Sequence, residues 1–285
     1  MSFTRTGGGG PLWSPGRCSR ITGREFVRDV RAGTSPAPRR WRGVAMRHLR
    51  VFRIAACLGL AACVAPAGAA PPPPPAPGAV RIMPLGDSIT QGNREHPSYR
   101  RPLWQKLTAA GYSVDFVGSL RENFQGPNPN DDFDLDHEGH WGWKVSDILA
   151  KLDGWLAQNT PDVILVHLGT NDANARKPEE ILNDLEAIVD LARKHNPKVK
   201  VLMAQLMTPW GAIPRVNAEI PKLAQRKSTP ASPVIAVDQS AGFEARKDRD
   251  TYDGCHPNAS GEEKMAARWF EALRKVLPPP KARAR

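Results

Sequence analysis

The sequence predicts an α/β fold, a three-layer α/β/α sandwich in which helices cover both faces of a five-stranded parallel sheet. The first observation is a series of short runs of Val, Ile and Leu that are apolar on both faces, as a buried parallel sheet requires. They cover 80–85, 114–117, 163–168, 199–206 and 234–237. The second is a helical repeat of apolar residues at three- and four-residue spacing, over 145–156, 181–189 and 265–276. Alternating strands and helices predict right-handed crossovers that cover the sheet on both sides.

Charge is distributed unevenly along the chain. Residues 1–70 hold twelve arginines and only two acidic residues, so they carry +10 of the total formal charge of +11. Residues 71–285 are therefore almost neutral, at +1. Binding to nucleic acid needs Lys and Arg clustered on the folded domain. We therefore expect no nucleic-acid partner.

Residues 46–70 have the layout of a secretory signal. Three arginines precede an apolar run over 54–64, and small residues follow it. The run is shorter than the roughly 20 residues that a membrane-spanning helix needs. We expect export, to a secreted or periplasmic location, without a transmembrane helix.

The signal segment could be processed in two ways. Leu-Ala-Ala-Cys at 60–63 resembles a lipobox, which would make Cys63 a lipid anchor and the only contact with a membrane. The small residues at 67–69 would instead allow cleavage to a soluble product. Residues 1–45 are interpreted as an N-terminal extension that precedes a better initiator, Met46.

The remaining sequence predicts one domain. Residues 71–79 begin with five prolines and form a stiff polyproline II linker in this interpretation. Residues 80–277 are enough for one well-buried domain, and 278–285 form a short basic tail. Of the four cysteines, only Cys255 lies in this domain, so no disulfide is expected there and Cys255 is expected to be a small buried residue.

Polar residues follow two of the predicted strands, at the edge where parallel sheets carry their sites. Ser88 follows the first strand between Gly86 and Gly92, where its hydroxyl could project from the sheet or could cap a helix. Asn171 follows the third strand, and its amide suits an oxygen that develops negative charge, although turn chemistry would also explain it.

A third candidate stands before the last predicted helix. Asp253 precedes His256 by three residues, in a turn that contains Gly254 and Pro257. At this spacing the carboxylate can hold one nitrogen of the imidazole ring while the other acts as a general base. The Asp253–His256 pair is a stronger candidate for catalysis because Ser88 and Asn171 also occur in the chain.

These blocks together resemble the SGNH or GDSL hydrolase family. The matching stretches are Gly-Asp-Ser-Ile-Thr-Gln-Gly at 86–92, Gly-Thr-Asn-Asp at 169–172 and Asp-Gly-Cys-His-Pro-Asn at 253–258. A fourth block at 138–145 supplies a glycine, Gly142. The resemblance covers 80–277 and implies a flavodoxin-like SGNH hydrolase fold.

The resemblance also implies a role for each matching residue. Ser88 would be the nucleophile, His256 the general base, and Asp253 the group that orients the imidazole ring. The N–H groups of Ser88 and Gly142 and the side chain of Asn171 would form the oxyanion hole. Neither a metal nor an organic cofactor is required.

Further stretches are similar to the third carbohydrate esterase family, typified by acetylxylan esterases. They are Met-Pro-Leu-Gly-Asp-Ser-Ile-Thr at 83–90, a Tyr-Arg pair leading into 103–107, and Asp-His-Glu-Gly-His at 136–140. The resemblance implies an acetylated polysaccharide or another small ester as substrate. Two alternatives stay open: an esterase directed at lipids or thioesters, and a catalytically idle carbohydrate-binding protein.

Two tryptophans are candidates for stacking on a sugar ring. Trp141 precedes Gly142, and Trp210 follows the fourth predicted strand; Trp143 is expected to pack in the core instead. Either candidate could equally be an ordinary apolar residue at the surface.

Two acidic or histidine-rich stretches could suggest a metal. Aspartates in the loop 131–136 offer the oxygen ligands that calcium prefers, but they lack EF-hand spacing, so we expect a solvated loop; they are Asp131, Asp132, Asp134 and Asp136. His137, Glu138 and His140 lack a further ligand at a spacing typical of zinc. The oligomeric state cannot be predicted from the sequence.

Overall fold

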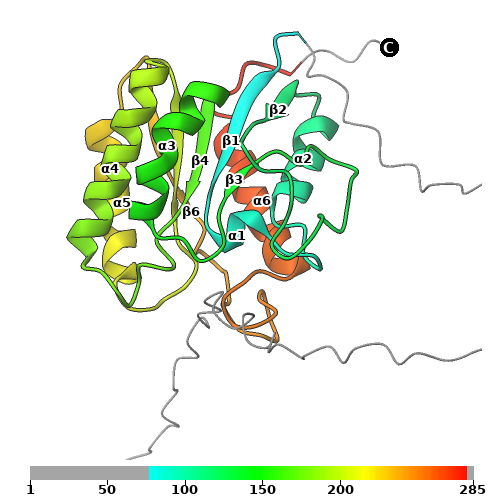
Figure 1. The fold of residues 1–285 in the computed structure, drawn as a ribbon, viewed down its shortest axis with the longest axis vertical. Helices are drawn as coiled ribbons and strands as arrows, with labels where there is room; N and C mark the ends of the chain where they lie inside the picture. Colours follow the sequence, from blue (N-terminus) through cyan, green and yellow to red (C-terminus); the bar gives the residue numbers. More distant parts are fainter. Residues whose placement is uncertain (1–76, 281–285) are drawn as a thin grey trace, which may run out of the picture. The chain divides into compact units, whose positions relative to one another are not determined.

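The computed structural model describes residues 77–280. The predictions for the extension 1–45, the signal segment 46–70 with Cys63, and most of the linker and tail lie outside the described residues. Within them, the chain forms the predicted parallel sheet with helices on both faces (Figure 1).

Five strands form the sheet in the order β2-β1-β4-β5-β6, and every pairing is parallel. They are β1 (Val80–Gly86), β2 (Val114–Phe116), β4 (Val163–His167), β5 (Lys200–Gln205) and β6 (Val234–Asp238). Each begins and ends within one residue of its predicted run. A sixth strand, β3 (Glu138–Gly139), has only two residues and pairs with the end of β1. The sequence did not predict β3, because two residues show no periodicity.

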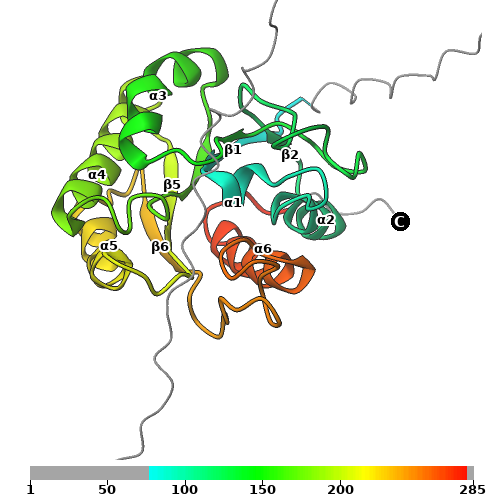
Figure 2. The same cartoon turned by 60° about the horizontal axis from the view of Figure 1, so that its bottom comes forward.

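Two helical layers complete the sandwich (Figures 1 and 2). One layer consists of α3 (Val145–Asn159), α4 (Pro178–His195) and α5 (Ile213–Lys227), whose buried apolar side chains share one core cluster with the sheet. The other consists of α2 (Arg100–Ala109) and α6 (Ala259–Leu273), which pack together over the opposite face. A single turn, α1 (Ser88–Gln91), begins directly after β1.

Two of these helices were not predicted. Helix α2 buries only Leu103 and Leu107 as apolar residues, together with Arg100, so its sequence lacks a broad apolar stripe. Helix α5 contains Pro221 in its interior and a second proline in its first turn. Because proline normally interrupts a helix, this composition concealed the helical repeat.

The strand order creates a crevice at the carboxyl edge of the sheet. Strand β1 lies between β2 and β4, and the helices that follow β1 and β4 cover opposite faces. The loops after β1 and β4 therefore diverge, which in open α/β sheets is the place where ligands bind. These are the loops that carry Ser88 and Asn171.

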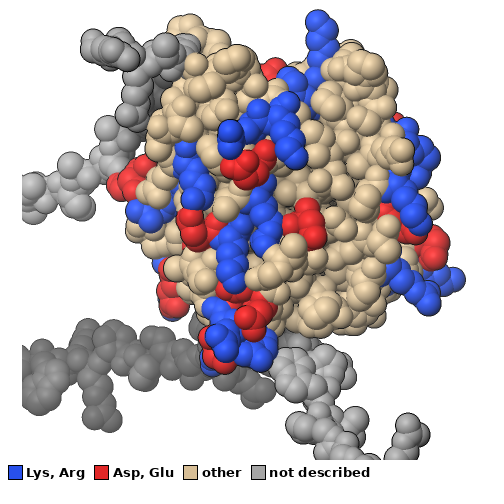
Figure 3. Space-filling model, turned by 180° about the vertical axis from the view of Figure 1, so that it is seen from behind, with Lys and Arg blue, Asp and Glu red and all other residues tan. Residues whose placement is uncertain are grey.

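The surface carries mixed charge. On the face shown in Figure 3, Lys and Arg side chains stand beside Asp and Glu side chains and do not form one basic field. Elsewhere in the described residues such charges form ion pairs, for example Arg226 with Glu186 and Lys227 with Asp190. No helix in residues 77–280 is long and apolar enough to cross a membrane.

Candidate active site

Ser88 stands at the first position of α1, where a tight turn leaves β1. The N-cap is Asp87, whose Oδ1 accepts the backbone N–H of Ile89 at 2.9 Å, so Asp87 and not Ser88 caps this helix. The turn requires Gly86, because a Cβ atom there would lie 2.1 Å from Oγ1 of Thr90 and 2.8 Å from the carbonyl oxygen of His167. Capping by Asp87 leaves the Ser88 hydroxyl available for other partners.

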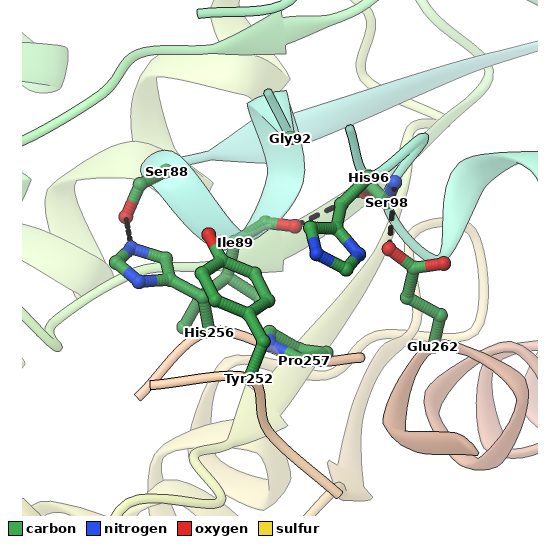
Figure 4. A pocket seen from close by; sticks show the side chains of 9 residues that line it. All are labelled: Ser88, Ile89, Gly92, His96, Ser98, Tyr252, His256, Pro257 and Glu262. Atoms are coloured by element: carbon green, nitrogen blue, oxygen red, sulfur yellow. Dashed lines mark hydrogen bonds between the residues drawn. The ribbon is translucent and has the colours of Figure 1, made fainter. Parts of the chain in front are cut away.

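The partner of Ser88 is His256. The Ser88 hydroxyl lies 2.9 Å from Nε2 of His256, and Nδ1 of the same ring lies 2.7 Å from Oδ2 of Asp253 (Figure 4 shows the first of these contacts). An ionised carboxylate only accepts hydrogen bonds, so the ring proton of His256 lies on Nδ1, which faces Asp253. Nε2 is then free to accept a hydrogen bond from the serine hydroxyl. The structure thus brings the three predicted residues into one hydrogen-bonded series across 168 positions of sequence.

Asp253 is fixed by its own turn. Its Oδ1 accepts the backbone N–H groups of Cys255 at 2.9 Å and His256 at 2.7 Å. Burial acts to raise the pKa of Asp253, but the hydrogen bonds from His256 and Cys255 and the charge of His256 together outweigh it, and the pKa lies below its ordinary value. Asp253 is therefore ionised at neutral pH and can stabilise a protonated imidazole ring.

Gly142 lies in a loop that is tied to the nucleophile turn on one side and to Asn171 on the other. Trp141 donates its backbone N–H to Oε1 of Gln91 in α1 at 2.8 Å, and the carbonyl of Trp143 accepts from Nδ2 of Asn171 at 2.9 Å. Gly142 has a φ of +78° and is exposed. An amide nitrogen has two N–H groups, so Asn171 keeps a second donor. The residues on either side of Gly142 are thus hydrogen-bonded to the turn that carries Ser88 and to Asn171.

The histidine-rich stretch serves to hold this loop. Glu138 is fully buried, and its carboxylate accepts from the hydroxyl and the N–H of Ser119 at 2.7 and 2.8 Å. It also lies 2.7 Å from Nε2 of His140, whose ring stacks with Trp143 and Trp155 at centroid distances of 4.5 and 4.6 Å. Trp143 packs against the core, as predicted. In residues 77–280, no group of three His, Cys, Asp or Glu side chains has the arrangement to hold a metal ion.

The acidic loop is used for contacts within the protein. Asp132 forms an ion pair with Arg101 at 2.7 Å, and Asp136 forms one with Arg121 at 2.6 Å. Oδ2 of Asp134 accepts the backbone N–H of a residue in β2 at 2.9 Å. Three of the four aspartates therefore anchor the loop, and Asp131 is exposed.

Arg100 organises the site and was not predicted from the residue pattern. It is fully buried and forms no ion pair with a carboxylate of residues 77–280, and its guanidinium donates to the carbonyl oxygens of Thr90, Gln91 and Leu135 and to Oδ1 of Asn123, at 2.8–3.0 Å. Burial lowers its pKa to about 10. One side chain thus joins the nucleophile turn to the two loops beside it. The Tyr-Arg pair of the family motif was its only signal in the sequence.

A small pocket that is partly open to solvent lies beside Ser88 and His256 (Figure 4). Besides Ser88 and His256, its lining includes His96, Tyr252 and Glu262. Burial raises the pKa of Glu262 to about 7, although Glu262 accepts the backbone N–H of Ser98 at 3.0 Å. Burial likewise raises the pKa of Asp87 to about 7, and Oδ2 of Asp87 has no hydrogen-bond partner among the described residues.

The two candidate sugar-stacking tryptophans occupy different places. Trp141 is half-buried and stacks with Phe124 and His256, at centroid distances of 4.3 and 4.6 Å. Trp210 is half-buried in the loop after β5, and the next residue, Gly211, is pressed against the backbone of Ala173, two residues beyond Asn171. Both lie near the predicted oxyanion residues, and their binding to a sugar stays a prediction.

A serine, a histidine and an aspartate in hydrogen-bonded series at the carboxyl edge of a parallel sheet is the arrangement of a serine hydrolase. The sequence model of the GDSL-like lipase/acylhydrolase family matches residues 85–264. Among solved structures, a serine-to-alanine mutant of an acetyl esterase with an acetate ion is 35% identical, with a TM-score of 0.62, over 69% of this chain and 97% of that one. A carbohydrate esterase family 3 from Talaromyces cellulolyticus is also 35% identical, with a TM-score of 0.61 and the same two coverages.

A multidomain esterase from Ruminococcus flavefaciens is 32% identical over 237 residues, which are 73% of this chain and 30% of that protein. The chain thus spans less than a third of the length of this relative. With the family model matched over most of the folded region, the chain belongs to the GDSL-like lipase/acylhydrolase family, and its relatives include family 3 carbohydrate esterases. It has the predicted parallel α/β fold, and the solved structures that it resembles at 35% identity include an acetyl esterase.

Proposed function

We propose that this esterase removes O-acetyl groups from polysaccharides through an acyl-serine intermediate on Ser88. The observation that carries the proposal is the series from the Ser88 hydroxyl through His256 to Asp253, with contacts of 2.9 and 2.7 Å. The acetyl group and the carbohydrate are suggested by the acetyl esterase and the family 3 carbohydrate esterase that the chain resembles.

In the first half of the reaction, Oγ of Ser88 forms a bond to the acyl carbon while Nε2 of His256 accepts the hydroxyl proton. The negative charge on the former carbonyl oxygen is stabilised by the N–H groups of Ser88 and Gly142 and by the second N–H of Asn171. Each such donor contributes on the order of 3 kcal/mol to the transition state. The C–O bond to the sugar then breaks, and the leaving alkoxide takes the proton from Nε2.

In the second half, water replaces the alcohol. Nε2 of His256 accepts a proton from water as the water oxygen bonds to the acyl carbon of the acyl-serine. The bond to Oγ of Ser88 breaks, the serine recovers its proton from Nε2, and acetate leaves. Asp253 keeps the ring in the tautomer that both halves need and stabilises its positive charge.

The test compares acetate release from acetylated xylan, acetylated chitin, acetylated pectin and peptidoglycan, with the Ser88→Ala variant as control. We expect release from at least one polysaccharide, and loss of release in the variant with an unchanged circular dichroism spectrum. Preference for p-nitrophenyl octanoate over p-nitrophenyl acetate, with no release from any polysaccharide, would contradict the proposal and favour a lipid-directed esterase. Full turnover by Ser88→Ala would refute the role of the serine.

We further propose that the enzyme acts outside the cytoplasm, either cleaved at 67–69 or anchored through Cys63. The support is the signal-like layout of 46–70 alone. Intact mass and labelling with a palmitate analogue separate the two forms. A cellular protein that retains residues 1–45 would contradict both.

A further inference from the structure

The imidazole ring of His256 belongs to a series of stacked aromatic rings. Trp141 stacks with His256 at a centroid distance of 4.6 Å and an interplanar angle of 15°, and Tyr252 stacks with the same ring at 5.6 Å and 12°. Phe124 continues the series from Trp141 at 4.3 Å, and His96 continues it from Tyr252 at 4.2 Å. In Figure 4 the ring of Tyr252 lies between those of His256 and His96. The proposed general base is therefore held by ring contacts as well as by Asp253.

Trp141 is attached to the nucleophile turn through its backbone. Its N–H donates to Oε1 of Gln91 at 2.8 Å, and Gln91 is the last residue of the turn that begins with Ser88. The residue before Trp141, His140, donates its N–H to the carbonyl of Gly86 at 3.0 Å. The indole ring that contacts His256 thus shares one frame with the Ser88 hydroxyl.

The stacking matters because the contact with Asp253 does not by itself fix the orientation of the imidazole ring. A contact at Nδ1 alone allows the ring to pivot about that atom, and the Asp253 side chain is 41% exposed, so water competes for the contact. A flat neighbour at 4.6 Å restricts the pivot to the plane that directs Nε2 at Oγ of Ser88. The face of an indole ring also attracts a cation within about 6 Å, and the imidazole ring becomes a cation when it takes the serine proton.

We infer that Trp141 is a positioning residue for His256: its indole ring fixes the imidazole plane and stabilises the positive charge that forms on it during catalysis. The inference rests on the proposed function. It assigns Trp141 to the proton-transfer step and not to sugar stacking, and Trp141 is absent from the lining of the pocket beside the serine. Phe124 supports the indole ring from outside, and Tyr252, whose hydroxyl oxygen accepts from Nδ2 of Asn93 at 3.0 Å, adds the second ring contact to His256.

The experiment measures kcat and KM of the full-length protein on two esters, p-nitrophenyl acetate, which has no sugar, and an acetylated xylo-oligosaccharide. For Trp141→Leu we expect kcat to fall about tenfold on both esters, equivalent to about 1.4 kcal/mol of transition-state stabilisation, while KM changes by less than about twofold. Trp141→Phe, which keeps an aromatic face, should restore most of the lost kcat. The matched control is Trp104→Leu, at a tryptophan in α2 that packs edge-on against Phe116, and we expect less than about a twofold change in kcat.

Phe124→Leu keeps the inference testable if Trp141→Leu fails to fold, because it removes the support and leaves the indole ring in place. We expect kcat to fall about threefold on both esters. A loss confined to the oligosaccharide, seen as a higher KM, would overturn the inference in favour of sugar stacking. Equal kcat in Trp141→Leu and the wild type would overturn it as well. A wild type inactive on both esters would instead contradict the proposed function.

Discussion

Replacing Asp253 with asparagine should inactivate the enzyme more completely than replacing it with alanine, although the asparagine variant should be the more stable of the two. Oδ1 of Asp253 accepts two backbone N–H groups, at 2.9 and 2.7 Å. The amide of asparagine must therefore place its oxygen there, since an amide nitrogen would face two donors. Its NH₂ group then takes the place of Oδ2 and donates to Nδ1 of His256. The proton of the ring moves to Nε2, which can no longer accept from Ser88.

The size of both effects follows from these contacts. In the asparagine variant, the wrong tautomer of His256 should lower kcat about ten-thousandfold, as it does in the Ser-His-Asp template. Alanine removes a charge next to the imidazolium, worth about 4 kcal/mol near a protein surface. Because the Asp253 side chain is 41% exposed, screening reduces this to about 2–3 kcal/mol, or about a hundredfold in kcat. Alanine also loses both backbone hydrogen bonds, which should cost about 2 kcal/mol of the free energy of unfolding.

The assay measures kcat with p-nitrophenyl acetate and Tm by circular dichroism on the wild type and both variants. We expect the order of kcat to be wild type, alanine, asparagine, and the order of Tm to be wild type close to asparagine, with alanine about 4–8 °C lower. An asparagine variant with a higher kcat than the alanine variant would show that the hydrogen bonds to Oδ1 do not control the tautomer of His256.

Three further predictions concern residues around Ser88, His256 and Asp253. Burial raises the pKa of Glu262 from 4.5 to about 7, so the folded state holds more protons than the unfolded state in this window and the free energy of unfolding falls as pH rises through it. Glu262→Gln should make this fall smaller and leave the part that comes from Asp87, whose pKa burial also raises to about 7. A Tm profile across pH that matches the wild type would contradict the prediction. Gly142→Ala keeps the backbone N–H and has room for a Cβ, but a φ of +78° is strained for alanine, so we expect a cost of about 1 kcal/mol in stability. Relief of this strain should turn the N–H away from the substrate oxygen and lower kcat about tenfold, and wild-type kcat together with the lower stability would argue against the oxyanion role. Arg100→Lys cannot reproduce four hydrogen bonds, and we expect about 3 kcal/mol less stability in urea unfolding, whereas an unchanged midpoint would show that the guanidinium contacts are dispensable.

Periodicity predicted the sheet well because parallel strands are buried on both faces. All five predicted runs became strands, and their order places β1 between β2 and β4. The helices were predicted less completely. Pro221 concealed α5, and α2 buries the charged Arg100 where an apolar residue would be expected. Tertiary contacts, which a local pattern does not contain, stabilise both.

The residues of the candidate site were predicted because each follows or precedes a regular element at the same edge of the sheet. The rule that loops after parallel strands meet at one edge brought Ser88 and Asn171 near each other, and the motif blocks added Asp253 and His256. The stacking of Trp141 on His256 could not be predicted in this way. It depends on the conformations of two loops that are 115 positions apart in the sequence, and no repeat encodes their relative placement.

Ester hydrolysis by this protein should proceed through Ser88. Titration with a fluorophosphonate, a reagent that forms a stable bond to an activated serine, tests it most directly when peptide mass spectrometry locates the adduct and acetate release from acetylated xylan is measured on the same samples. We expect one adduct per chain, on Ser88, with acetate release falling in proportion to its occupancy. An adduct at another residue, or full acetate release from completely modified protein, would contradict it.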